Sequence, residues 1–206
     1  MWWFNMTDVV KKLLEVAKTI LLYKEPIAIF IPFKKDGDTM KAGEIAFEVE
    51  ASIHTILQCE RVLLNCMQRM SGIATLTYDT KNMADCFIAA TRKTLPHLID
   101  KKAVALGQGL THRLNLNDFI MIKDNHLGIL GGNIKEALEF ANKSKSKYIE
   151  IEVKNEKEAM EASKSILNLK SNKSFAILFH NMGSSVIKNT IIEINNILEN
   201  YNNKNL

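Results

Sequence analysis

Tyr148-Ile149-Glu150-Ile151-Glu152-Val153 has the apolar character of a short buried strand, and Phe175-Ala176-Ile177-Leu178-Phe179 repeats that pattern 27 residues later. A similar stretch begins at Phe119, 29 residues before Tyr148. Helical spacing of apolar residues follows each stretch in turn, over 133–143, 155–167 and 184–201. Strands and helices that alternate at this interval predict βαβ units, and therefore a parallel sheet that is either doubly wound or bent into a barrel.

The N-terminal part of the chain is organised differently. Its apolar residues predict a helix from Thr7 onward and two strands, at 27–33 and 45–50. A longer helix is predicted over 52–78, with a break near Ser71-Gly72. A further apolar segment at 86–90 is expected to be the first strand of the parallel sheet.

We therefore expect an α/β protein with two domains. Residues 1–80 are predicted to form a small N-terminal α+β sandwich domain whose long helix bridges to the second domain. Residues 81–206 are predicted to form an incomplete parallel α/β barrel, because only four strands are readable where a closed barrel needs about eight.

Composition excludes several classes of protein. The longest apolar run, 27–33, contains Pro32 and is too short to span a membrane. The N-terminus lacks the features of a secretory signal, so we expect a cytoplasmic protein. Its three cysteines match no disulfide frame or zinc motif. The net charge of +4 gives no strong basic excess, so no nucleic-acid partner is expected.

Polar and charged residues gather where the predicted strands end. They are Thr91-Arg92-Lys93-Thr94, His112-Arg113, Lys123-Asp124-Asn125-His126, Glu152 and His180-Asn181. Loops at the carboxyl ends of parallel strands converge on one opening, which we call the mouth of the sheet. The mouth is expected to hold the Arg, Lys and His residues of this set, with Glu152 as the main counter-charge.

Such a mouth suits a ligand with several negative charges. The chain has 23 Lys but only four Arg, and a remaining Arg can mark a place that needs a planar, two-pronged donor. Arg grips carboxylate or phosphate, and a Glu can hold a divalent metal that carries a pyrophosphate. A single Lys or Arg is usually only a solvated surface residue, but five on one mouth favour a binding site.

Several longer strings form a set of ordered motifs: Glu60-Arg61, Gln68-Arg69-Met70-Ser71-Gly72, Thr91-Arg92-Lys93-Thr94-Leu95-Pro96, His112-Arg113-Leu114 and Ile122-Lys123-Asp124-Asn125-His126. Together they resemble one enzyme family, nicotinate-nucleotide pyrophosphorylase (carboxylating), also called quinolinate phosphoribosyltransferase. The resemblance implies a pentosyltransferase of NAD biosynthesis. Such an enzyme converts quinolinate and phosphoribosyl pyrophosphate to nicotinate mononucleotide, pyrophosphate and carbon dioxide.

The resemblance also implies roles for individual residues and a homodimer. Arg61 would reach the neighbouring subunit's site. Arg92, His112 and Arg113 would bind the quinolinate carboxylates. Lys93 and Lys123 would be catalytic, facing the substrates where carboxylate and pyrophosphate meet. Glu152 would also be catalytic and would bind Mg²⁺ with phosphoribosyl pyrophosphate, and His180 would contact substrate.

His180 is a departure from the family pattern, which has an Asp there, and Gln108 stands where the family has the middle glycine of three. Imidazole in place of a carboxylate weakens the expected site for Mg²⁺. Two alternatives therefore stay open. One is a shortened, non-catalytic family member that keeps the dimer surface and the dicarboxylate pocket, and the other is an unrelated TIM-like lyase acting on a phosphorylated substrate.

Overall fold

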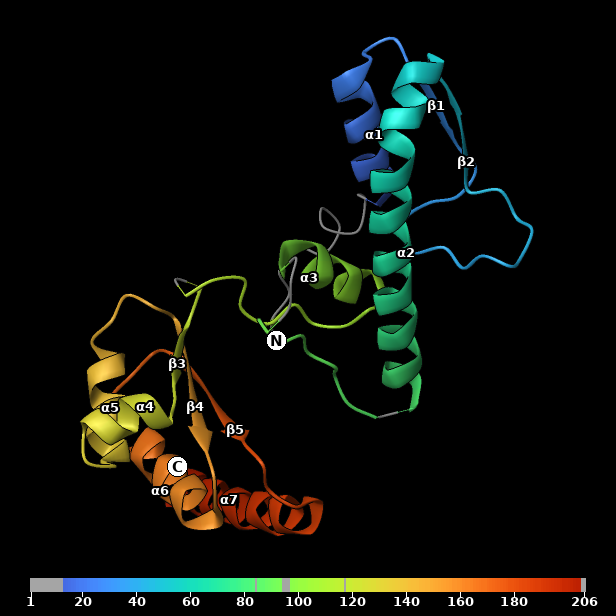
Figure 1. Ribbon diagram of the computed structural model, residues 1–206. Helices are drawn as coiled ribbons and strands as arrows, with labels where there is room; N and C mark the ends of the chain where they lie inside the picture. The colour runs from blue at the N-terminus through green and yellow to red at the C-terminus, as the bar shows by residue number, and fades with distance from the viewer. Residues whose placement is uncertain (1–12, 84, 94–96, 117, 205–206) are drawn as a thin grey trace. The chain divides into compact units, whose positions relative to one another are not determined.

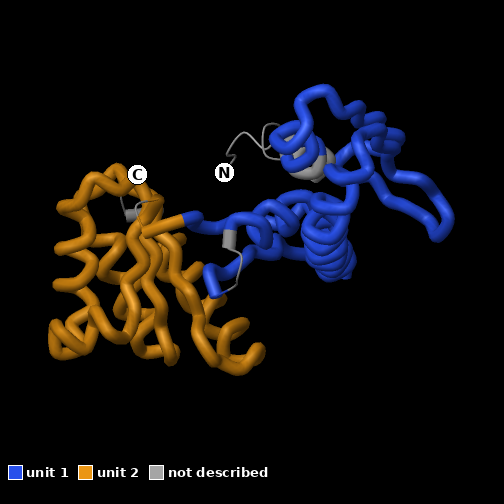
Figure 2. Tube along the Cα trace, turned by 45° about the horizontal axis from the view of Figure 1, so that its top comes forward, with its two compact units in different colours: residues 1–114 blue, residues 115–206 orange. Residues whose placement is uncertain are grey.

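The structure is a computed structural model that describes residues 13–83, 85–93, 97–116 and 118–204. The chain divides into two compact units, 1–114 and 115–206 (Figure 2). The domain boundary expected after residue 80 stays a prediction.

The first unit begins with a helix and a two-stranded antiparallel sheet (Figure 1). Its elements are α1 (Leu13–Lys24), β1 (Ile29–Pro32) and β2 (Phe47–Glu50). The rings of Phe30 and Phe47 stack across the sheet with centroids 4.9 Å apart. The part of the predicted first helix before residue 13 lies outside the described residues.

Helix α2 (Ile53–Met83) is continuous, so the break predicted near Ser71-Gly72 is wrong. Met70, just before this point, is 1% exposed and packs with Ala103 and Leu106. Glycine in a helix interior lowers stability by only about 1 kcal/mol. Packing on one side of the helix therefore holds it straight through Gly72.

Helix α3 (His97–Leu106) was not predicted, and it packs against α2. The strand predicted at 86–90 is wrong, because this segment forms only one isolated parallel bridge, Ala89 to Leu110. Residues 107–109 turn tightly next to α2: a Cβ on Gly107 would lie 2.7 Å from Thr77 Cβ. Leu110 therefore follows the turn directly, and the chain on this side of the bridge is too short to form further strand pairs.

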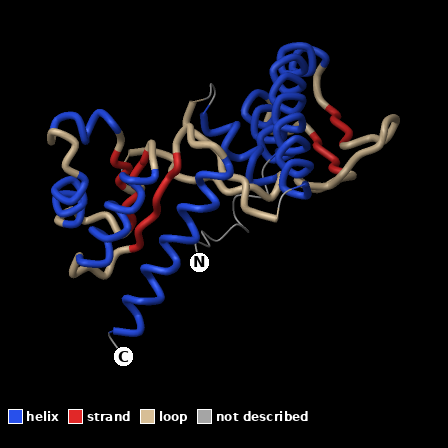
Figure 3. Tube along the Cα trace, turned by 90° about the horizontal axis from the view of Figure 1, so that it is seen from below, coloured by secondary structure: helices blue, strands red, loops and turns tan. Residues whose placement is uncertain are grey.

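The second unit is a parallel α/β layer in the order expected from the sequence. Its elements are β3 (Ile120–Ile122), α4 (Asp124–Ile129), α5 (Ile134–Asn142), β4 (Tyr148–Val153), α6 (Glu156–Asn168), β5 (Ser174–Phe179) and α7 (Ser184–Lys204). The strands pair in parallel in the order β3-β4-β5 (Figure 1), and Figure 3 shows strands in red and helices in blue. The helix predicted over 133–143 corresponds to α5, whereas the short helix α4 before it was not predicted.

The core of the second unit lies on one face of the sheet. Alternate residues of β4, Ile149, Ile151 and Val153, are fully buried against apolar residues of α5 and α6. Glu150 and Glu152 project from the opposite face. The sheet thus separates an apolar layer from the face that carries the charged side chains.

The fold-class prediction is confirmed: a unit with a small antiparallel sheet precedes a parallel α/β unit. No helix in the described part of the chain is both long enough and apolar enough to cross a membrane.

Candidate functional site

Three predicted site residues meet at the carboxyl ends of β3, β4 and β5. Lys123 follows β3, Glu152 is near the end of β4, and His180 follows β5. The parallel register pairs Ile122 with Ile151 and Val153 with Phe179, so the strands end side by side. We call Lys123, Glu152 and His180 the strand-end cluster.

Glu152 is the centre of the strand-end cluster. Its Oε2 lies 3.8 Å from Lys123 Nζ, and its Oε1 lies 3.3 Å from His180 Nδ1. Glu152 is 8% exposed, whereas the side chains of Lys123 and His180 are 35% and 41% exposed. The nearly buried carboxylate of Glu152 therefore lies beside two nitrogen groups that are more exposed than it is. These nitrogen groups can bind anions or hydroxyl groups.

Backbone contacts fix the cluster. The amide of His180 donates to the carbonyl of Val153, at 2.9 Å, which extends the β4–β5 pairing. The amide of Lys123 donates to Nδ1 of His126, also at 2.9 Å, at the start of α4. The backbones of Lys123 and His180 are thereby anchored at the point where the chain leaves the sheet.

A second ion pair braces the same edge of the sheet. Lys154 Nζ donates to Asp124 Oδ2 at 3.0 Å. This hydrogen bond lowers the pKa of Asp124 and raises the pKa of Lys154. The sequence analysis named Asp124 but missed Lys154, whose signal was its place directly after β4.

The first unit holds two more cationic segments next to each other. Arg92 and Lys93 follow one side of the Ala89–Leu110 bridge, and His112 and Arg113 follow the other. Arg92 and Lys93 are exposed, whereas His112 and Arg113 are half-buried. Because the bridge is parallel, both pairs leave it in the same direction.

Two buried charged residues of α3, Asp100 and Lys101, were missed by the sequence analysis. Arg69 grips Asp100 with two bonds, Nε to Oδ1 and a terminal nitrogen to Oδ2, each 2.7 Å long. Lys101 donates to the carbonyls of Ala90 and Thr111. A signal was present, because Asp100, Lys101 and Lys102 interrupt an otherwise apolar segment over 98–106.

Arg61 lies on α2 and is exposed. It is two residues from both Cys59 and Leu63, which are buried, and so it projects from the opposite side of the helix. Its reach into a neighbouring subunit stays a prediction. We also expect the cationic segments of the first unit and the strand-end cluster to form one binding site, and this stays a prediction.

The site offers few ligands for Mg²⁺ among the described residues. Among the described residues no group of three or more His, Cys, Asp and Glu side chains could hold a metal ion. Glu152 offers one carboxylate in the cluster, which suits Mg²⁺ only when substrate phosphates and water supply the remaining ligands. The residues therefore fit a metal that arrives with a polyphosphate.

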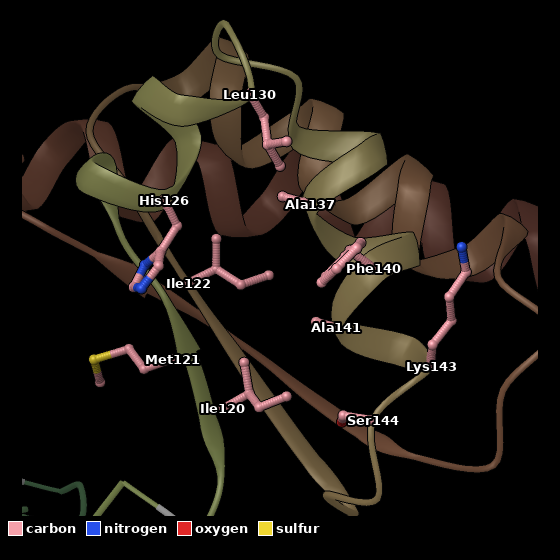
Figure 4. A pocket seen from close by; sticks show the side chains of 10 residues that line it. All are labelled: Ile120, Met121, Ile122, His126, Leu130, Ala137, Phe140, Ala141, Lys143 and Ser144. Atoms are coloured by element: carbon pink, nitrogen blue, oxygen red, sulfur yellow. The ribbon is translucent and has the colours of Figure 1, made fainter.

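A cavity of about 400 Å³ lies elsewhere in the second unit, between β3 and α5 (Figure 4). Ile120, Ile122 and Phe140 give it a mostly apolar lining. None of the strand-end cluster lines it. Its chemistry does not match a dicarboxylate or a pyrophosphate, so the charged edge of the sheet is the better candidate site.

Comparison with known proteins identifies similar domains in both parts of the chain. The N-terminal domain of quinolinate phosphoribosyl transferase matches residues 9–71, and its C-terminal domain matches residues 73–201. A probable nicotinate-nucleotide pyrophosphorylase (carboxylating) of Methanothermobacter thermautotrophicus is 38% identical over 189 residues. This match covers 87% of the chain and 64% of that relative.

Solved structures agree with the sequence matches. NadC from Streptococcus pyogenes superposes with a TM-score of 0.76 at 33% identity, over 87% of this chain and 64% of that one. Nicotinate-nucleotide pyrophosphorylase from Ehrlichia chaffeensis gives a TM-score of 0.75 at 31% identity, over 88% and 65%. The chain thus spans about 64% of the length of these relatives.

Proposed function

Because the chain belongs to the quinolinate phosphoribosyl transferase family, we propose that it transfers a phosphoribosyl group from phosphoribosyl pyrophosphate to quinolinate. The products are nicotinate mononucleotide, pyrophosphate and carbon dioxide. The observation that carries the proposal is the strand-end cluster, which presents Lys123 and His180 around Glu152 at the carboxyl edge of a parallel sheet. Family membership supports the substrates.

The proposed chemistry needs positioning and charge more than covalent help. A bond forms between the quinolinate ring nitrogen and the ribose C1, and the bond from C1 to pyrophosphate breaks. The C–C bond to the adjacent carboxylate then breaks, carbon dioxide leaves, and the ring carbon takes a proton. A dicarboxylate and a pyrophosphate repel each other, so their approach requires dense positive charge.

Each predicted residue has a part in this scheme. Arg92, His112 and Arg113 would bind the carboxylates, because Arg offers a bidentate match to them. Lys93 and Lys123 would neutralise the charge that develops between the two substrates. Glu152 would hold Mg²⁺ brought by the pyrophosphate, and this ion would offset the charge of the leaving group. His180 would donate to the ribose or phosphate oxygens.

The test is a calorimetric titration with quinolinate and then with Mg²⁺ and phosphoribosyl pyrophosphate, followed by an assay for nicotinate mononucleotide. We expect binding of both and turnover. Arg92→Ala and Arg113→Ala should abolish quinolinate binding, whereas Lys135→Ala, a change at a lysine that is 71% exposed in α5, should not alter it. Undiminished binding in both Arg variants would reject the proposal.

A homodimer in which Arg61 serves the partner's site is part of the proposal. Arg61→Ala and Lys123→Ala should each be inactive alone. When the two variants are mixed, some dimers will contain one site with both residues intact, and up to about a quarter of the wild-type activity should return. No recovery in a mixture shown to exchange subunits would reject the shared site.

A non-catalytic family member is the second candidate. The observation in its favour is that both oxygens of Glu152 already face nitrogen groups, at 3.8 and 3.3 Å, which competes with metal binding. Binding of quinolinate without turnover would support this candidate over the first.

A further inference from the structure

Lys101 is a buried charged residue for which the proposed chemistry has no role. It lies in α3 with 2% of its surface exposed. Its ammonium group donates to the carbonyl of Ala90, at 2.9 Å, and to the carbonyl of Thr111. A charged group in a protein interior persists where polar partners replace its hydration.

The two acceptors occupy special positions in the chain. Ala90 directly precedes Thr91-Arg92-Lys93, and Thr111 directly precedes His112-Arg113. One ammonium group therefore joins the backbones of both cationic segments at the point where each leaves the Ala89–Leu110 bridge.

The bridge itself supplies two backbone hydrogen bonds at this point. The amide of Ala90 donates to the carbonyl of Leu110, at 2.9 Å, and the amide of Leu110 donates to the carbonyl of Ile88, at 2.7 Å. His112 has a φ of 54°, in the left-handed region that non-glycine residues rarely adopt. A conformation of this kind persists only when its surroundings hold it.

The helix that carries Lys101, α3, is held against α2. Its neighbour Asp100 is 4% exposed and is held by Arg69 of α2 through two bonds. Ala103, one half-turn along α3, is fully buried against Met70. The position of the ammonium group is thus fixed through α3 by the long helix.

We propose that Lys101 is a positioning residue for the dicarboxylate substrate, acting through the backbone to hold the Arg92-Lys93 and His112-Arg113 segments in their binding arrangement. This inference rests on the proposed function, because it assigns these segments to the quinolinate carboxylates. Lys101 does not touch the substrate. It fixes the backbone positions from which the substrate-binding side chains extend.

The test compares Lys101→Met, which keeps the length of the side chain but removes its charge and donors, with Lys101→Gln, which is neutral but polar. Lys135→Met is the control for loss of an exposed lysine charge. We expect the KM for quinolinate to rise at least about 10-fold in Lys101→Met, which corresponds to an affinity for quinolinate about 10-fold weaker than in the wild type. The KM for phosphoribosyl pyrophosphate should change by less than about 2-fold.

Amide exchange in the full chain gives a readout that needs no substrate. In Lys101→Met the amides of Ala90 and Leu110 should exchange at least about 10-fold faster, because their segments lose a shared anchor. The amides of β4 should be unaffected. Failure of the wild type to bind quinolinate would reject the proposed function, and the exchange rates would still decide whether Lys101 orders the segments.

Three outcomes would overturn the inference. They are an unchanged KM for quinolinate in a folded variant, unchanged exchange at Ala90 and Leu110, and loss of cooperative unfolding in both Lys101 variants. The last would show that Lys101 supports the whole unit rather than the two segments.

Discussion

Single residues in the first unit determine how closely the turn at 107–109 approaches α2. A Cβ on Gly107 would fall against the carbonyl of Ala74 and 2.7 Å from Thr77 Cβ, and a Cβ on Gly109 would fall 2.7 Å from Val104 Cγ1. Between them, Gln108 adopts a φ of 64°, where an L residue is strained. The site segments thus depend on two positions without a side chain.

Gly107→Ala should destabilise the folded chain by about 2 kcal/mol, because overpacking against a fixed backbone cannot relax. Chemical denaturation would measure it. The matched control is Gly72→Ala, since Gly72 lies inside α2 and a Cβ there would meet nothing within 4 Å. That change should stabilise the chain by about 0.5 to 1 kcal/mol. Equal effects at the two positions would contradict this interpretation.

Asp124 makes a small contribution to stability at neutral pH, and this contribution is lost in acid. Lys154 donates to Asp124 and holds the pKa of Asp124 below its usual value of 3.8. A lowered folded pKa stabilises the folded state above the unfolded pKa, and this stabilisation is lost as the pH falls through the folded value. Asp124→Asn should lower the Tm at pH 7, and the difference from the wild type should vanish well below pH 3.8. A difference independent of pH would refute this.

The secondary structure of the second unit was predictable because its helices are amphipathic and its strands are nearly all apolar. The strands β3, β4 and β5 and the helices α5, α6 and α7 lie close to their predicted ranges. Helix α3 was not predicted, because its charged residues Asp100 and Lys101 are on its buried side, against the usual pattern. Only tertiary partners make that arrangement stable.

The N-terminal cap of α6 can be tested by substitution. The side chain of Asn155 accepts from the amide of Glu158 at 2.9 Å, and its own amide donates to Glu158 Oε1. Asn155→Ala should lower the free energy of unfolding by about 1 kcal/mol, whereas Asn155→Ser should retain most of it. Urea denaturation would measure both. Equal losses in the two variants would show that the cap is not the cause.

Across the molecule, the adjacency of Lys123, Glu152 and His180 follows from the parallel order of the strands, which was predictable from the sequence. The roles assigned to these residues stay predictions. Glu152 was predicted as the counter-charge at these strand ends, but its separate contacts with Lys123 and His180 were not predictable, because side-chain rotamers at strand ends depend on local packing. The same holds for Lys154 and Lys101, whose partners are distant in sequence.

The two units should differ in local stability. The second has an extensive core around Ile149, Ile151 and Val153, whereas β1 and β2 form a two-stranded sheet with exposed apolar side chains. Amide exchange in the full chain should therefore be slowest in β4 and fastest in β1 and β2. Comparable protection in both sheets would contradict this expectation.

The burial of Lys101 also makes its amine a chemical reporter. Lysines on the surface are accessible to acylating reagents, whereas an ammonium group that is 2% exposed reacts only when its surroundings open. The rate of acylation at Lys101, read by peptide mass spectrometry against Lys135 as an internal reference, would follow the opening of the first unit in crude samples. Labelling kinetics at one side chain would thus monitor the integrity of the unit in which that side chain is buried.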